Sequence, residues 1–409
     1  MKAWNIVLDF AHTYYRAMPV KIFQKSVDKI AQLWYNTIAK RLVRPPVSFG
    51  PGGFFCEVTS TVKEFKTYRQ LLQILRGRGL DIKKGSQGAR TMRILESENY
   101  YNVINGYKYF FLVPKPTSTT VETYIAGTTF DEIYALYCFD RNVRNIYLRF
   151  LLKAENKFKT VVSHEFSRLY GHNNYLKLEN FQCTASTDLS RLRYIASREG
   201  LDPATDFIKI ARISMEENIS SVTELLGDIQ KEISRQMSKH HNVVTHYMAE
   251  HGYIPLWVLV NVLTFGKITN FYLNMKDADK LVIAKQFGLS IAELHKYMVN
   301  LGIARNLCAH DERFFDIRFK KYIKTKSIKN FASLGITYVS GNYKYGTNDA
   351  YAVAIMLSLV LEKSDVKEFI SAMKNEFAKL AKQLHTISCS QIMEHMGFGS
   401  NWERLVSLK

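Results

Sequence analysis

The sequence has few cysteines, and no two of them are closely spaced. Its five cysteines lie at positions 56, 138, 183, 308 and 389 and form no CxxC motif. Zinc sites and disulfide frameworks use characteristic cysteine spacings, so neither is expected. Scattered thiols in a chain without an export signal are typical of a reducing compartment, and we predict a cytoplasmic protein.

Long hydrophobic runs are absent too. The longest, residues 350–361, is too short to cross about 30 Å of hydrocarbon. Near the N-terminus, Asp9 interrupts the only stretch that resembles the hydrophobic region of a signal peptide. We therefore predict neither a membrane-spanning helix nor a membrane partner.

Acidic residues are scarce relative to basic ones. The 409 residues include 56 Lys and Arg but only 37 Asp and Glu, which gives a formal charge of +19. Such an excess favours a polyanionic partner, and without a lipid-binding segment the predicted partner is nucleic acid rather than a membrane. The alternative is a protein that is simply basic and soluble. The 25 Phe and 24 Tyr argue for an ordered chain.

Motifs for nucleotides and metals are also missing. The glycines at 77 and 79, like those in 50–53, stand in no strand–turn–helix pattern with Lys-Ser/Thr, so no phosphate-binding loop is predicted. His246 and His251 would lie about 140° apart on a helix and would not converge on a metal. We predict no cofactor and no metal. Alternating strand and helix patterns are absent, so the predicted fold class is mainly α.

The chain divides into four regions. Residues 1–62 are an extension of unknown role with linker signals at Pro45-Pro46. Residues 63–130 are helical and aromatic, 131–320 carry the strongest helical patterns, and 321–409 contain the last helices. Helices are expected at about 64–78, 89–97, 130–168, 206–250, 254–266, 281–287, 291–301, 348–362 and 366–384.

The tract 130–168, as one helix or two, has two different faces. Apolar residues recur at a spacing of three or four, as in a core-facing stripe, at Val143, Tyr147, Phe150, Ala154, Phe158 and Val161. Basic residues recur on the other side at Arg141, Arg149, Lys153 and Lys157. This basic row could hold an RNA backbone, or it could be a solvated helix face. Glu155 interrupts the apolar stripe, and a lone acid there is usually a surface charge or an ion-pair partner.

Aromatic residues cluster just before this tract, at Tyr100, Tyr101, Tyr107, Tyr109, Phe110 and Phe111. Such rings could stack on nucleobases. We favour the other interpretation, an aromatic core that covers neighbouring helices.

Segment 305–310 carries candidate chemistry. Arg305 and His310 form an R-x4-H motif with Asn306 directly after the arginine. RNA carries its own nucleophile, the ribose 2′-OH beside each phosphodiester. A histidine can transfer protons near neutral pH, and an arginine can stabilise phosphorane charge. The motif therefore indicates RNA cleavage without a metal, with Asn306 orienting one of the other two side chains.

The spacing adds a geometric expectation. On a regular helix Asn306 and His310 share a face, while Arg305 lies about 140° from His310. One histidine cannot comfortably be both base and acid in one turnover. A two-fold dimer that juxtaposes two motifs is therefore the natural form of the hypothesis.

The R-x4-H string alone is weakly specific. Arg235 and His240 repeat it in a polar stretch without apolar framing. A structural arginine and histidine at a helix–helix contact would give the same string. The copy at 305–310 is distinguished by the apolar residues 301–304 before it and the segment 311–315 after it.

Beyond this motif, several elements of the chain form a recognisable combination: Phe65–Tyr68 with Arg78-Gly79-Leu80, Asn99-Tyr100-Tyr101 with Gly106-Tyr107, Phe130–Arg141 with Arg144, Pro255-Leu256-Trp257 with Leu263–Gly266, Arg305–Arg313, and Met396–Trp402. With these elements, residues 63–409 resemble the bacterial abortive-infection (Abi) proteins of the AbiD/AbiF type, whose core is a HEPN domain. Two positions depart from the family pattern: Asn102 stands where arginine is expected, and Asp311 stands where a second histidine is.

The resemblance implies a HEPN-type helical bundle over 131–320, completed by the helices of 321–409. It implies an antiphage ribonuclease in which Arg305 and His310 are catalytic and Glu155 steadies one of them. It also implies a cognate small non-coding RNA beside the substrate RNA, and a basic surface that holds RNA. To that surface we assign Arg141, Arg144, Arg149, Lys153, Lys157 and Arg313. The alternative is a non-catalytic RNA-binding or interaction protein that uses the HEPN fold as a dimer platform.

Overall fold

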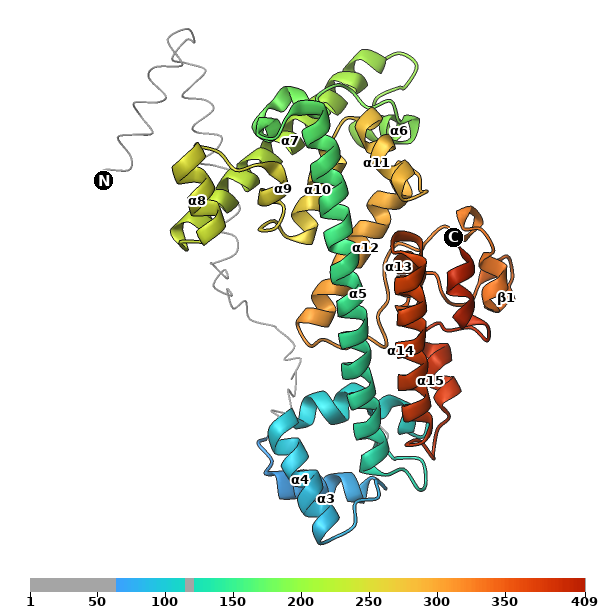
Figure 1. Ribbon diagram of the computed structural model, residues 1–409. Coiled ribbons are helices and arrows are strands. Elements are labelled where there is room, and N and C mark those ends of the chain that lie inside the picture. Colours follow the sequence, from blue (N-terminus) through green and yellow to red (C-terminus); the bar gives the residue numbers. More distant parts are fainter. Residues whose placement is uncertain (1–63, 115–120, 409) are drawn as a thin grey trace, which may run out of the picture. The chain divides into compact units, whose positions relative to one another are not determined.

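Helices make up most of the structure, a computed structural model that describes residues 64–114 and 121–408 (Figure 1). The predicted mainly α fold class is confirmed. The extension predicted at 1–62 lies outside the described residues. The helices are α3 (Tyr68–Gly77), α4 (Ser86–Glu98), α5 (Phe130–Tyr170), α6 (Leu189–Glu199), α7 (Phe207–Ser238), α8 (Asn242–His251), α9 (Leu256–Leu259), α10 (Phe265–Asn274), α11 (Asp277–Gln286), α12 (Ile291–Ala309), α13 (Ala350–Val360), α14 (Lys363–Ala381) and α15 (Cys389–His395).

Short elements connect these helices. Tyr101–Asn105 form a π-helical turn. In the described residues the regular strands are β1 (Tyr338–Val339) and β2 (Asn342–Tyr343), an antiparallel hairpin in which Tyr338 pairs with Tyr343. Single 3-10 turns lie at Lys108–Phe111, Asn174–Leu176, Leu178–Asn180, Thr325–Ser327, Phe331–Leu334 and Trp402–Leu408.

Helix α5 is the element around which α12 and α14 pack (Figure 1). The sequence left open whether the tract held one helix or two, and the structure has a single helix of 41 residues. It begins with a capping box between Thr129 and Glu132 and has no internal glycine or proline. It ends at Gly171, whose φ of 84° lies in the region that favours glycine.

The predicted apolar stripe of α5 is buried. Val143, Tyr147, Phe150, Ala154 and Phe158 are each fully enclosed. Val161 is only partly buried, and the next residue, Val162, takes its place in the core.

Helix α13 is the longest apolar run of the chain, and every one of its residues is buried. Its N-cap is Asp349, whose carboxylate accepts hydrogen bonds from the backbone N–H groups of Ala352 (3.0 Å) and Gly346 (2.7 Å). Gly397 passes so close that a Cβ there would lie 2.2 Å from Asp349 Oδ2, so only glycine fits. Among the described residues, no helix is both long and apolar enough to span a membrane.

Two predicted helices are interrupted. The expected helix at 254–266 is wrong, because α9 ends at Leu259 and α10 begins at Phe265. Thr264 caps α10 by accepting a hydrogen bond from Lys267 N–H, a role that suits threonine better than a helix interior. The tract 206–250 breaks into α7 and α8 near His240, which has a positive φ of 52°. Residues 66–409 make one compact unit, and the predicted divisions at 130 and 320 stay predictions.

Candidate active site

The R-x4-H motif lies at the C-terminal end of α12. A capping box between Ser290 and Glu293 starts this helix, which ends at Ala309. His310 is the C-cap, and its backbone N–H donates to the carbonyl of Asn306 at 3.0 Å. Asp311 follows with a φ of 58°, a left-handed conformation that turns the chain away from the helix axis. The motif's histidine therefore lies one residue beyond the last helical residue.

The motif side chains reach solvent at this helix end. Asn306 and His310 are exposed, and the side chain of Arg305 is one-third exposed. Arg305 Nη1 donates to Asn306 Oδ1 at 3.5 Å, so these two side chains are in contact. Cys308, inside the motif, is buried, and burial raises the pKa of its thiol to about 12. That thiol stays protonated near neutral pH and is not a nucleophile.

Asn306 and His310 line different surface cavities. Asn306 lines a groove between α10 and α12, whereas His310 lines a cavity between the π-helical turn Tyr101–Asn105 and residues 310–313. The expectation that Asn306 acts together with His310 therefore rests on their common helix end and not on a shared cavity.

Glu155 of α5 contacts the motif's arginine, as the resemblance implies. Glu155 Oε2 lies 3.3 Å from Arg305 Nε, and Glu155 Oε1 lies 2.8 Å from Lys159 Nζ. The Glu155 side chain is only 8% exposed. The approach to Arg305 is an ion pair without hydrogen-bond alignment, since neither atom has a hydrogen-bond partner. The predicted contact is present, and its role in catalysis stays a prediction.

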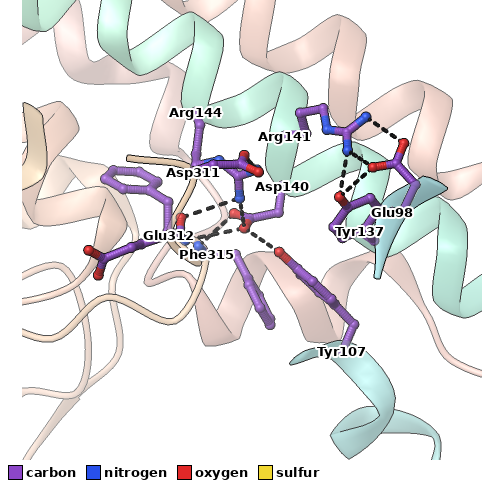
Figure 2. A network of polar contacts seen from close by, with 10 residues as sticks. Glu98, Tyr107, Tyr137, Asp140, Arg141, Arg144, Asp311, Glu312 and Phe315 are labelled. Carbon is purple, nitrogen blue, oxygen red and sulfur yellow. Dashed lines mark hydrogen bonds and ion pairs between the residues drawn. The ribbon is translucent and has the colours of Figure 1, made fainter. Parts of the chain in front are cut away.

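A buried polar network, which we call the Asp140 cluster, fixes the segment after the motif (Figure 2). It consists of Tyr107, Asp140, Arg144, Asp311 and the backbone of residues 312–315. Asp140 accepts hydrogen bonds from Tyr107 Oη (2.7 Å), from Arg144 Nη1 (2.8 Å) and from the backbone N–H groups of Phe314 (3.2 Å) and Phe315 (2.8 Å). One carboxylate on α5 thereby holds the chain just after His310.

Arg144 completes the cluster from the other side. Its guanidinium donates to the carboxylate of Asp311 and to the carbonyl of Glu312 at 3.3 Å. Burial raises the pKa of the Asp140 carboxyl, while the Arg144 charge and the three other donors act in the opposite direction. Burial, with the adjacent Asp140 carboxylate, raises the pKa of the Tyr107 hydroxyl, which therefore stays a donor. The cluster holds the carboxylate of Asp311, the residue directly after the candidate catalytic histidine.

A family model described as Abi-like protein matches residues 93–316. The chain belongs to the Abi-like protein family. The matched residues contain α5, the Asp140 cluster and the whole R-x4-H motif. Membership supports a role in abortive infection. No match was found among curated proteins, and none was found among solved structures.

In this Abi-like protein the basic row of α5 is paired within the chain. Arg149 forms an ion pair with Glu368 of α14, and Lys153 lies 2.6 Å from Asp365 of the same helix. Lys157 pairs with Glu362, and Arg141 pairs with Glu98 of α4. The row therefore faces acidic partners rather than bare solvent, and its role in RNA binding stays a prediction.

Our assignment of Arg144 to the RNA surface is corrected by the structure. Its side chain is 3% exposed and its charge is taken up by Asp140 and Asp311. A phosphate could reach it only by breaking the Asp140 cluster, so Arg144 is a structural residue. Sequence carried a signal for this: Asp140 and Arg144 are an acid and a base four residues apart on a helix.

Arg313 is partly paired within the chain, and its role in RNA binding stays a prediction. Its side chain is half exposed, and Nη1 donates to the carbonyl of Gly106 at 3.0 Å. Asp316 lies 3.3 Å from the same guanidinium nitrogen. Arg313 therefore stands at the rim of the cavity that His310 lines, with part of its guanidinium in solvent.

The second R-x4-H copy has a different setting. Arg235 pairs with Glu232, while His240 lies beyond the end of α7. Glu232 also pairs with Lys267 of α10 at 3.1 Å, so it joins two helices. Arg235 thus belongs to a structural ion-pair group. In the described residues no group of three or more His, Cys, Asp or Glu side chains could hold a metal ion.

Proposed function

We propose that this Abi-like protein is a HEPN-type endoribonuclease that cleaves RNA in abortive infection without a metal ion. The observation that carries the proposal is the placement of the motif: Arg305 and His310 lie at the exposed end of α12, and Arg305 is paired with the buried carboxylate of Glu155. A positioned cation and an accessible histidine at one helix end provide the charge stabilisation and one of the two proton transfers that phosphodiester cleavage requires.

The proposed reaction uses the ribose of the substrate as nucleophile. The 2′-oxygen attacks the neighbouring phosphorus and loses its proton to a base, and the bond from phosphorus to the 5′-oxygen breaks as that oxygen gains a proton. His310 performs one of these transfers, and Arg305 stabilises the charge on the phosphorane oxygens. The products carry a 2′,3′-cyclic phosphate and a 5′-hydroxyl. No atom of the reaction needs a metal.

A second copy of the chain would supply the second histidine. Val299, Ile303, Asn306 and His310 follow at spacings of four, three and four along α12 and share one face. Val299 and Ile303 are 39% and 46% exposed, an apolar pair that continues into the motif. We propose that this face meets its own copy across a two-fold axis, which brings two motifs into one cleft.

The ribonuclease proposal is tested on purified protein in EDTA. We expect RNA cleavage with 2′,3′-cyclic phosphate ends, and a loss of at least about 100-fold in His310→Ala. His164→Ala is the matched control, because His164 is exposed on α5 at a distance along the chain from the motif. Activity that disappears in EDTA and returns with Mg²⁺ would overturn the mechanism.

The shared site is tested by mixing two inactive variants. Arg305→Ala and His310→Ala dimers, unfolded and refolded together, form mixed dimers in which one arginine and one histidine come from different chains. Recovery of cleavage above either parent is expected. If mass spectrometry detects mixed dimers and the mixture is still as inactive as its parents, the proposal of a composite site is wrong.

One observation favours the non-catalytic alternative, RNA binding on a dimer platform. The pairing of Arg305 with Glu155 reduces the charge that Arg305 can offer to a phosphate. Expression of the chain and of His310→Ala in bacteria under phage challenge separates the two functions. Equal protection by both proteins would support binding and exclude catalysis by His310.

A further inference from the structure

A cavity of about 430 Å³ lies beside His310. One wall is the π-helical turn Tyr101–Asn105, and the other is the segment His310–Arg313 that follows α12. The volume falls in the range of about 300–1,000 Å³ that small-ligand sites occupy. The cavity is therefore large enough for a small organic group within reach of the candidate catalytic histidine.

The π-helical turn presents polar groups to this cavity. Val103 and Ile104 of the turn are buried and anchor it to the core, so Tyr101, Asn102 and Asn105 face outward and are exposed. The backbone N–H of Tyr101 is held by Asn99 Oδ1 at 2.9 Å. Single π-helical turns are rare and are often found at functional sites.

The lining matches a nucleobase better than other ligands. The Tyr101 ring is 68% exposed and offers an aromatic face for stacking. The carboxamides of Asn102 and Asn105 carry both donors and acceptors, which can bond to the polar edge of a base. Asp311 is already paired with Arg144 in the cavity wall, so Glu312 is the acid that disfavours a phosphate inside, whereas Arg313 at the rim suits one outside it.

We propose that this cavity binds one unstacked nucleobase of single-stranded RNA, in the nucleotide next to the phosphodiester that is cleaved beside His310. The inference rests on the proposed ribonuclease function, and it names Tyr101, Asn102 and Asn105 as residues that determine where RNA is cut. A paired base cannot enter, because its polar edge is occupied and its faces are covered by its neighbours. The substrate class is therefore single-stranded or looped RNA.

Photocrosslinking tests the cavity independently of cleavage. The full-length His310→Ala protein is mixed with a short single-stranded RNA that carries 5-iodouridine at one position, irradiated and digested for mass spectrometry. We expect a crosslink to Tyr101. Tyr101→Ala should weaken binding of the same RNA about 5- to 100-fold. Tyr109→Ala is the matched control, because Tyr109 is 76% exposed on the neighbouring turn and does not line the cavity.

Sequencing of the cleavage ends gives the second readout. In otherwise wild-type protein, Asn102→Ala and Asn105→Ala should alter the base preferred next to the cut, which a merely structural role would not do. Crosslinks that map away from residues 101–105, with unchanged cleavage preference, would overturn the cavity assignment while leaving the ribonuclease intact. A Tyr101 crosslink in a protein that never cleaves RNA would instead support the base site and refute the catalytic proposal.

Discussion

Asp140 is the residue on which the geometry after the motif depends. It is fully buried and accepts four hydrogen bonds, one of them from the Arg144 guanidinium. Asp140→Asn turns one acceptor into a donor that faces a backbone N–H, and it leaves a buried arginine with less compensation. We expect the free energy of unfolding to fall by about 3–5 kcal/mol in chemical denaturation. The control is Asp131→Asn. Asp131 lies on the same helix as Asp140 and forms a half-exposed ion pair with Arg90 of α4, so its replacement should cost less than about 1 kcal/mol.

Glu155 is expected to act on cleavage through Arg305. Glu155→Gln keeps the shape of the side chain but loses the charge that holds the guanidinium, so the rate at saturating RNA should fall about 10- to 100-fold with little change in KM. Glu165→Gln is the control, because Glu165 is a similarly buried, paired acid on the same helix, bonded to Arg168 and Gln286. Equal rates for the two variants would show that Glu155 is structural only.

Single residues were the hardest feature to predict from sequence. The contact of Glu155 with Arg305 followed from the resemblance, whereas the pairing of Arg144 with Asp311 did not, because Asp311 lies 167 positions away along the chain. The aromatic residues predicted to form a core at 100–111 were also predicted only in part. Tyr107 and Phe111 are buried as predicted, but Tyr101 and Tyr109 are exposed. Composition predicts that aromatic side chains are buried on average. Which ones are exposed is decided locally, by the π-helical turn for Tyr101 and by the 3-10 turn Lys108–Phe111 for Tyr109.

At the scale of elements, periodicity predicted the long helices well. The apolar stripe of α5 and the start of α12 follow from spacing and capping residues in the sequence. The interruptions between α9 and α10 and between α7 and α8 were missed. Apolar residues continue through the first interruption, so hydrophobic spacing alone cannot reveal it, and only the capping threonine at 264 marks it. Such breaks depend on tertiary packing that a local pattern does not contain.

The ion pair between Glu232 of α7 and Lys267 of α10 should weaken in acid. Burial raises the pKa of Glu232, but hydrogen bonds from Arg235, Gln236 and Lys267 outweigh it and lower that pKa to about 2. A pKa below the unfolded value stabilises the fold above about pH 4.5, and this stability is lost as the pH falls toward 2. Between pH 5.5 and 3.5 the contribution should shrink by about 1 kcal/mol. The difference in free energy of unfolding between wild type and Glu232→Gln should narrow over that range, and a constant difference would contradict the assignment.

At the scale of the whole molecule, less of the charge of +19 is available to bind RNA than the sequence indicates. Many cations of α5 are paired with acids of α14 or α4, so the excess cannot be read as a continuous RNA-binding surface. Pairs between exposed side chains contribute little stability, however, and a phosphate can replace the carboxylate of such a pair. RNA binding by the row would then be an exchange of partners, which salt dependence can detect.

Removal of one acid from α14 tests this exchange. Glu368 pairs with Arg149, so Glu368→Gln frees this cation of the row, while Lys153 keeps its closer partner Asp365. Glu403→Gln raises the net charge equally but frees Lys374, which lies outside the row. If the row contacts RNA, Glu368→Gln should steepen the logarithmic salt dependence of single-stranded RNA binding by about 0.7 per phosphate gained, and Glu403→Gln should not. Because both variants carry the same net charge, equal slopes would mean that the gain is non-specific and that the row is a helix–helix contact alone.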